Sequence, residues 1–187
     1  EKLEDSEFDS PMGEATGAGA IFGVTGGVME AALRTAQDTL TGEDLPKIDF
    51  EQVRGTEGIK RATIEIAGKE INVVAASGLS NAREILEEIK SGKANYQFVE
   101  IMACPGGCIM GGGQPIKSSK IQAEVDVKKL RGQALYSIDE KSKIRKSHEN
   151  PVVRKIYEEY LEYPGSEIAE KLLHTTYTER EKYNIPM

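Results

Sequence analysis

The sequence predicts an α/β fold in which a small mixed β-sheet is flanked by helices and followed by a helical carboxy-terminal region. Three patterns indicate this fold. Apolar residues recur at helical spacing in 28–40, strand-like segments occupy 61–76 and 96–103, and helical periodicity dominates beyond Pro115. A chain of 187 residues can bury one hydrophobic core, so we expect a single domain that spans 1–187.

A glycine-rich stretch precedes the first expected helix. Glycines at 13, 17, 19, 23, 26 and 27 are typical of a loop, because a residue without Cβ adopts turn conformations readily. From Val28 to Leu40, apolar residues then return every three or four positions, which predicts a helix. Gly42 stands where a glycine commonly ends a helix.

A β-hairpin and a second helix are expected next. Residues 61–66 alternate between apolar and polar, residues 67–69 can form a turn, and residues 71–76 are an apolar run suited to a buried strand. Ser80 or Asn81 can cap the helix that follows, which we expect to end near Gly92. Its expected apolar face consists of Ala82, Ile85, Leu86 and Ile89.

The last expected strand, 96–103, leads directly into a loop that holds both cysteines, and a strand that delivers a loop is a common support for reactive groups. Beyond it, one or two solvent-facing helices are expected through Lys146. Pro151 suits the first turn of a further helix, and residues 164–166 should interrupt it before the helical pattern resumes. The polar tail, 174–187, is expected on the surface.

Charge and composition exclude several classes of protein. The formal net charge of -7 would repel nucleic acids and anionic membranes, so neither is an expected partner. Residues 1–10 are acidic and carry no export signal, and no apolar segment is long enough to span a bilayer, so we expect a cytoplasmic protein. Two cysteines cannot build a disulfide scaffold, and their clustering at Cys104 and Cys108 indicates metal or redox chemistry.

The segment from Met102 to Pro115 carries the chemistry. It reads Met-Ala-Cys-Pro-Gly-Gly-Cys-Ile-Met-Gly-Gly-Gly-Gln-Pro, and cysteine thiolates are the standard ligands of iron–sulfur clusters. Gly106 and Gly107 would let the backbone curl closely round a cluster and aim N–H groups at its sulfurs. A bare pair of cysteines at this spacing is also compatible with two reduced thiols in a tight loop.

The complete string resembles the third signature of the iron-only hydrogenases. That resemblance implies one lobe of their catalytic domain, with Cys104 ligating a [4Fe–4S] cubane and Cys108 bridging it to a two-iron subsite that bears CO and cyanide, together the H-cluster. Met102 would pack against the two-iron subsite. A second stretch, 16–34, is also similar to the family and implies that Phe22 and Gly23 line the same pocket. The implied reaction is 2H⁺ + 2e⁻ ⇌ H₂.

The ligand set of the implied cluster is incomplete in this chain. A [4Fe–4S] cubane ordinarily takes four protein ligands, and the sequence has two cysteines. We therefore expect the H-cluster to be incomplete or absent in the chain alone, and the missing N-terminal part of the catalytic domain to be a necessary partner. The resemblance also implies a ferredoxin or a nicotinamide-linked subunit as the electron partner.

Other interpretations stay open. A hydrogenase-like iron–sulfur assembly factor would keep a cubane without the two-iron subsite, and a hydrogen sensor would use the same cluster without rapid turnover. Gly17 and Gly19 before a helix also suggest a nucleotide-binding module, although the next glycine is one position late for the dinucleotide fingerprint. We expect His174 to be structural and His148 to be solvated, and Met110 stands where the family would have a smaller residue.

Overall fold

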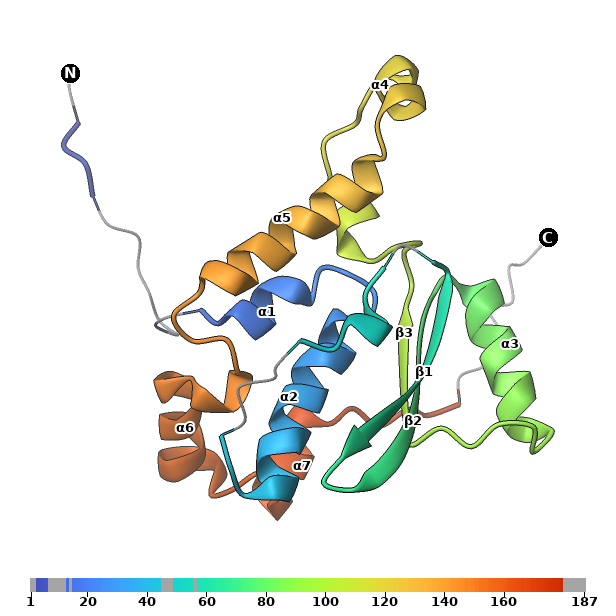
Figure 1. The fold of residues 1–187 in the computed structure, drawn as a ribbon. Coiled ribbons are helices and arrows are strands. Elements are labelled where there is room, and N and C mark those ends of the chain that lie inside the picture. Colours follow the sequence, from blue (N-terminus) through green and yellow to red (C-terminus); the bar gives the residue numbers. More distant parts are fainter. Residues whose placement is uncertain (1–2, 7–12, 14, 45–48, 56, 180–187) are drawn as a thin grey trace, which may run out of the picture. The chain divides into compact units, whose positions relative to one another are not determined.

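Figure 1 shows a computed structural model of the chain, which describes residues 3–6, 13, 15–44, 49–55 and 57–179. Its internal contacts divide the chain into two compact units, residues 1–150 and 151–187, and each unit is described by itself. The assignment of 1–187 to one domain therefore stays a prediction. No helix in the described part of the chain is both long and apolar enough to cross a membrane.

A three-stranded mixed sheet forms the centre of the first unit (Figure 1), as the sequence predicted. Strand β1 (Ile59–Ile66) pairs antiparallel with β2 (Lys69–Ser77), and β3 (Phe98–Met102) pairs parallel with the other edge of β2. Ala67 and Gly68 both have positive φ, 51° and 71°, as the tight turn of a two-residue hairpin requires.

Helices pack on both faces of the sheet (Figure 1). Helix α2 (Gly27–Thr41) ends at Gly42 as expected and packs on one face, and α3 (Leu79–Lys90) covers the other face as the crossover between parallel strands β2 and β3. Alternate residues of β2 serve the two cores, which explains its continuous apolar run. The α2 side buries Met29, Leu33, Phe50, Val53, Ile64, Ile66, Val73 and Ala75, and the α3 side buries Val74, Ala76 and Ile85.

Two predictions for α3 were wrong. Its N-cap is Gly78, at φ 85°, because the Asn81 side chain donates a hydrogen bond back to the Ser77 carbonyl at 2.7 Å. Its buried face is also narrower than expected, since Leu86 is 56% exposed.

The glycine-rich stretch is not all loop, because it contains the short helix α1 (Gly17–Ile21), capped by the Thr16 hydroxyl. A Cβ at Gly17 would lie 2.2 Å from Asp139 Oδ1, so a glycine allows α1 to lie directly against α5 (Val127–Lys141). Gly17 and Gly19 are thus helical residues. They do not form the turn of a dinucleotide fingerprint.

Short helical segments complete the first unit: η1 (Glu51–Val53), η2 (Cys108–Met110), α4 (Ser119–Glu124) and η3 (Ser147–Glu149). Helix α4 is exposed along its length. Helix α5 was expected to face solvent, yet it buries Gly132 and Asp139. The Asp139 side chain is fully buried with its charge.

The second unit is helical, as predicted. Helix α6 (Pro151–Ile156) starts at Pro151 and passes into a π-helical turn, η4 (Tyr157–Leu161). The break at 164–166 precedes α7 (Glu167–Leu173), whose first turn is capped by Ser166. His174 is exposed and lies 3.3 Å from a Glu170 carboxylate oxygen, in keeping with a structural role. The tail is described only as far as residue 179.

Candidate metal centre

Two free cysteines lie in the loop that follows β3. Cys104 comes two residues after the end of the strand, and Cys108 opens the 3₁₀ turn η2. Both thiols are exposed. Met102, the last residue of β3, is half-buried beside them in sequence. The strand therefore leads into one short loop with two accessible thiols, and their position directly after a strand agrees with the sequence prediction.

The turn between the cysteines depends on its glycines. Gly106 and Gly107 have φ values of +87° and +95°, a conformation that residues with a Cβ rarely adopt. A Cβ at Gly107 would lie 2.6 Å from the Gly23 carbonyl oxygen and 2.8 Å from the Thr25 nitrogen. Glycine at 107 thus permits backbone of the cysteine loop to contact backbone of a distant segment.

That distant segment is 22–26, here called the pocket loop, and residues 104–110 are here called the cysteine loop. The Ile109 N–H donates to the Gly23 carbonyl at 3.1 Å, and the Thr25 N–H donates to the Gly106 carbonyl at 3.3 Å. The structure therefore places Gly23 directly beside the cysteine loop. Phe22, the residue before Gly23, is 43% exposed, and Gly23 itself is half-buried.

The sequence predicted that the N–H groups of Gly106 and Gly107 would be aimed at cluster sulfurs, but both have partners within the protein. The Gly106 N–H donates to the Ser77 hydroxyl at 3.0 Å, and the Gly107 N–H donates to the Cys104 carbonyl at 2.9 Å. Both donors are therefore engaged within the protein and are not directed toward cluster sulfurs. Their physical role here is to fix the turn against the end of β2.

Two buried charged side chains, Glu100 and Lys60, bind the backbone of the pocket loop. Glu100, in the middle of β3, accepts hydrogen bonds from Gly26 N–H at 2.5 Å and Met29 N–H at 2.7 Å, at the amino end of α2. Lys60 Nζ, from β1, donates to the carbonyl oxygens of Thr25 and Gly55. Burial lowers the pKa of Lys60 to about 8, partly opposed by the charge of Glu100.

Sequence reasoning missed both of these residues. The available signal was a charged side chain inside an otherwise apolar strand, Phe-Val-Glu-Ile-Met, where an acidic residue rarely lies buried without a partner.

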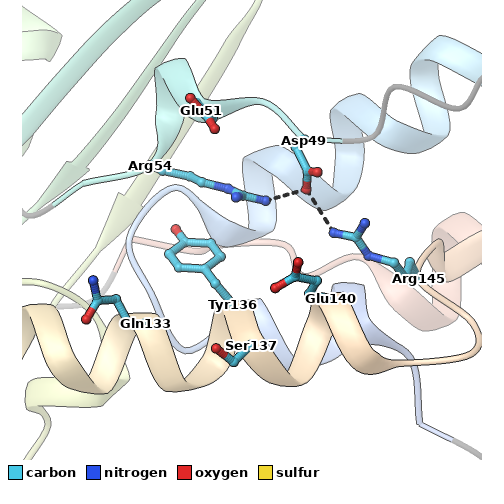
Figure 2. A pocket seen from close by; sticks show the side chains of 8 residues that line it. All are labelled: Asp49, Glu51, Arg54, Gln133, Tyr136, Ser137, Glu140 and Arg145. Carbon is cyan, nitrogen blue, oxygen red and sulfur yellow. Dashed lines mark hydrogen bonds and ion pairs between the residues drawn. The ribbon is translucent and has the colours of Figure 1, made fainter.

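A second polar feature of the first unit is a cavity of about 560 Å³ between the segment 49–54 and α5 (Figure 2). Arg54 lies over the Tyr136 ring at 4.4 Å, and Asp49 receives hydrogen bonds from Arg54 and Arg145. Burial raises the pKa of Tyr136. The cavity is lined by Asp49, Glu51, Arg54, Gln133, Tyr136, Ser137, Glu140 and Arg145, so neither cysteine borders it.

Three of these residues, Asp49, Arg54 and Arg145, also belong to a closed ring in which three arginines and three carboxylates alternate, here called the ionic ring. Arg34 bonds to Asp139 and Glu30, each at 2.8 Å. Arg145 joins Asp139 to Asp49, and Arg54 joins Asp49 back to Glu30. Although burial opposes ionisation of Asp139, hydrogen bonds from Arg34 and Arg145 hold its pKa below the usual value. The ring has equal numbers of positive and negative charges.

Three further residues considered from the sequence are His148, Met110 and Glu14. His148 is half-buried, not solvated as expected, because its ring nitrogens contact the Thr35 hydroxyl at 3.0 Å and Asp38 at 3.1 Å. Met110 is 41% exposed, and its sulfur lies 3.8 Å from Arg131, so it packs outward. Glu14, an acidic residue of the glycine-rich stretch that could take part in proton transfer, lies outside the described residues.

The donor set fits half of an iron–sulfur cubane. Two exposed thiols stand on a loop whose backbone is fixed by Ser77 and by the pocket loop, and thiolates are the usual ligands of such clusters. The sequence has no third cysteine. The remaining ligands of a cubane would have to come from another polypeptide segment.

Comparison with known proteins agrees with this chemistry. The family model described as the C-terminal domain of the iron-only hydrogenase large subunit matches residues 1–112, and the model of the iron hydrogenase small subunit matches residues 125–180. The NADP-reducing hydrogenase subunit HndD of Solidesulfovibrio fructosivorans is 49% identical over 180 residues, 96% of this chain. The chain spans only 30% of that relative.

A solved structure and a more distant relative widen the comparison. A variant of [FeFe]-hydrogenase HydA1 from Chlamydomonas reinhardtii matches with a TM-score of 0.66 and 41% identity, over 94% of this chain and 50% of that chain. The cytosolic iron-sulfur assembly component 3 of Bos taurus is 30% identical over 185 residues, 97% of this chain and 37% of that protein. The similarity therefore covers enzymes and an assembly component.

Proposed function

The chain belongs to the iron-only hydrogenase large-subunit family, and we propose that it is the part of an [FeFe] hydrogenase that holds one side of the H-cluster. The observation that carries this proposal is the docking of the cysteine loop on the pocket loop through the Ile109–Gly23 and Thr25–Gly106 hydrogen bonds. When bound, the cluster would supply the redox chemistry of 2H⁺ + 2e⁻ ⇌ H₂.

Each residue of the site has a proposed task. Cys104 ligates the cubane and Cys108 bridges it to the two-iron subsite, while Gly106 and Gly107 give the turn between them its shape. The Met102 thioether is a weak acceptor and a soft apolar group, suited to lining a pocket that excludes water. We assign it to the pocket wall.

Phe22 and Gly23 complete the proposed pocket wall. Phe22 is exposed in this chain although it is a large apolar residue, which suits a side chain that another segment or a cofactor covers. Gly23 brings its backbone close to the cysteine loop, because its carbonyl accepts the Ile109 N–H.

Two further ligands must come from outside this chain. The relatives are larger proteins, of which the chain spans 30% and 50% in the two cases above. We propose that the missing N-terminal part of the catalytic domain supplies these ligands and covers the face that bears Cys104 and Cys108. Relatedness to an NADP-reducing hydrogenase subunit favours a nicotinamide-linked subunit over a ferredoxin as the electron partner.

The test is reconstitution of the chain alone and of the chain combined with the part of HydA1 that it does not match. Both samples receive iron, sulfide and the two-iron precursor, and hydrogen evolution is measured with a strong reductant. We expect turnover only from the combination. Cys104→Ser and Cys108→Ser should abolish it, whereas Gln122→Ala, an exposed residue of α4, should leave it unchanged. Turnover by the chain alone would contradict the need for further ligands.

An iron–sulfur assembly role is the second candidate, because the assembly component of Bos taurus is similar along nearly the whole chain. The two roles differ in the two-iron subsite. Infrared bands of CO and cyanide in the reconstituted combination support the hydrogenase, and a cubane spectrum without those bands supports the assembly factor. A loaded cluster with bands but negligible turnover would instead indicate a hydrogen sensor.

A further inference from the structure

Glu100 is an unusual residue for the middle of a strand. It lies between Val99 and Ile101 in β3, and only 6% of its surface is exposed. Its two carboxylate oxygens accept hydrogen bonds from the Gly26 and Met29 amides, which lie 74 and 71 residues away in sequence. A buried carboxylate is costly unless it is well partnered, and these amides at the amino end of α2 are suitable partners.

The position of Glu100 joins the two halves of the site. Its own strand ends at Met102 and continues directly into Cys104. Its partners belong to the end of the pocket loop and the first turn of α2, directly after Phe22 and Gly23. One side chain therefore connects the strand that carries the cysteines to the loop that carries the proposed pocket wall.

Simple helix capping does not require this arrangement. Helices α4, α5 and α7 of the same chain are capped locally, by the side chains of Ser118, Asp126 and Ser166. At α2 the N-cap is Gly26, at φ +93°, where a Cβ would lie 2.0 Å from the Val53 carbonyl oxygen. No side chain fits at that position, so the carboxylate comes from β3.

Lys60 complements Glu100 on the same loop. The carboxylate of Glu100 accepts the Gly26 N–H, while the ammonium of Lys60 donates to the Thr25 carbonyl, so two opposite charges bind the two polar ends of a single peptide group. Thr25 in turn donates its N–H to the Gly106 carbonyl of the cysteine loop. The path from Glu100 to the cysteine loop thus runs through two adjacent backbone units, Gly26 and Thr25.

We propose that Glu100 is a positioning residue for the cluster: through Gly26 and Thr25 it fixes the spacing between the cysteine loop and the pocket loop. The inference rests on the proposed function. Glu100 is neither adjacent to a cysteine in the sequence nor hydrogen-bonded to one. The chemical consequence is that it nevertheless controls how tightly Cys104 and Cys108 retain iron.

The experiment compares Glu100→Gln with the wild type, each combined with the complementary part of HydA1 and loaded with iron and sulfide. The glutamine is isosteric, but its NH₂ group must face one of the two amide donors, so one hydrogen bond is lost. We expect iron retention against a chelator to fall about tenfold or more, as for other groups that orient metal ligands. The reduction potential of the cubane should also become less negative, because a buried negative charge is removed.

Two further variants keep the result interpretable. Glu65→Gln makes the same substitution at an exposed position of β1 and should match the wild type in iron retention and potential. Glu100→Asp keeps the charge and two acceptor oxygens with a shorter reach, so unlike Glu100→Gln it sets no donor against the Gly26 and Met29 amides. We expect its potential to stay near the wild-type value while its iron retention falls.

The outcomes separate the inference from the proposed function. If the Glu100 variants lower thermal stability but retain iron and potential like the wild type, Glu100 only caps α2 and the inference is overturned. If the wild-type combination itself binds no iron, the proposed function fails and the inference fails with it. Loss of iron retention in the Glu100 variants, with Glu65→Gln unaffected, supports the positioning role.

Discussion

Two groups of charged residues in the first unit, the ionic ring and the pair Glu100 and Lys60, bind different kinds of partner. In the ionic ring, Arg34, Asp139 and their four companions meet opposite charges and close on themselves. At the pocket loop, Glu100 instead accepts hydrogen bonds from backbone amides, and Lys60 donates to backbone carbonyls. The ring joins α2, the segment 49–54 and α5, whereas the second pair fixes the backbone of a loop.

The difference explains how the site can be rigid and still reactive. Charges that satisfy one another, as in the ring, have little capacity left for a ligand. Charges that bind backbone groups leave the neighbouring side chains unoccupied, and the thiols of Cys104 and Cys108 are indeed free and exposed. The fold therefore uses self-contained ion pairs to join α2 to the segments packed against it, and single charges to shape the candidate metal centre.

The largest predicted effect comes from opening the ionic ring. Arg34 is fully buried, so Arg34→Met leaves Asp139 with Arg145 alone and Glu30 with Arg54 alone, and gives the ring one buried negative charge in excess. We expect the free energy of unfolding to fall by about 3–5 kcal/mol, measured by chemical denaturation of the chain.

Arg61→Met is the matched control for the ring. Arg61 pairs with Glu84 and Glu88 on the exposed side of α3, so its loss should cost less than about 1 kcal/mol. If the two substitutions lower the free energy of unfolding equally, the closed ring stabilises the chain no more than the exposed ion pairs of Arg61 do.

The second prediction concerns the backbone contact between the two loops. Gly107→Ala must place a Cβ 2.6 Å from the Gly23 carbonyl oxygen in a left-handed conformation. We expect about 2–3 kcal/mol of lost stability and failure of the reconstituted combination to retain iron, measured by thermal unfolding and by iron content.

Gly112→Ala provides the comparison within the same glycine run. A Cβ there would meet nothing within 4 Å, and its φ lies outside the left-handed range, so unfolding should change by only a few tenths of a kcal/mol. If both alanines are tolerated equally, the close approach of the loops is not what holds the site together.

Local sequence patterns predicted the elements that depend on neighbours along the chain. The periodicity before Gly42 predicted α2, and the alternation of 61–66 predicted the hairpin. The position of the cysteines after a strand was also correct. In each case the signal and the structure lie within the same short segment.

The features that could not be predicted depend on contacts between distant segments. Arg34 meets Asp139 across 105 residues, and neither position differs in pattern from a solvated charge on a helix. The cap of α3 was wrong because Asn81 binds backwards to Ser77 instead of capping. Likewise, the motif predicted that Gly106 matters, but only the fold shows that its amide binds the Ser77 hydroxyl.

The smallest predicted effect separates the two charge groups by pH. Because burial lowers the pKa of Lys60 to about 8, from 10.5 in the unfolded chain, the unfolded state holds one more proton between these values. The Lys60 contribution therefore makes stability rise with pH across this window, by about 1 kcal/mol per pH unit. The pKa values of Arg34, Arg54 and Arg145 are raised above the already high value of an ordinary arginine, so these side chains contribute no slope there. Unfolding of wild type and Lys60→Met at pH 8 to 10 isolates the effect, since all other titrating groups are shared. The wild type should gain stability relative to Lys60→Met as pH rises, and parallel profiles would mean that burial does not lower the pKa of Lys60.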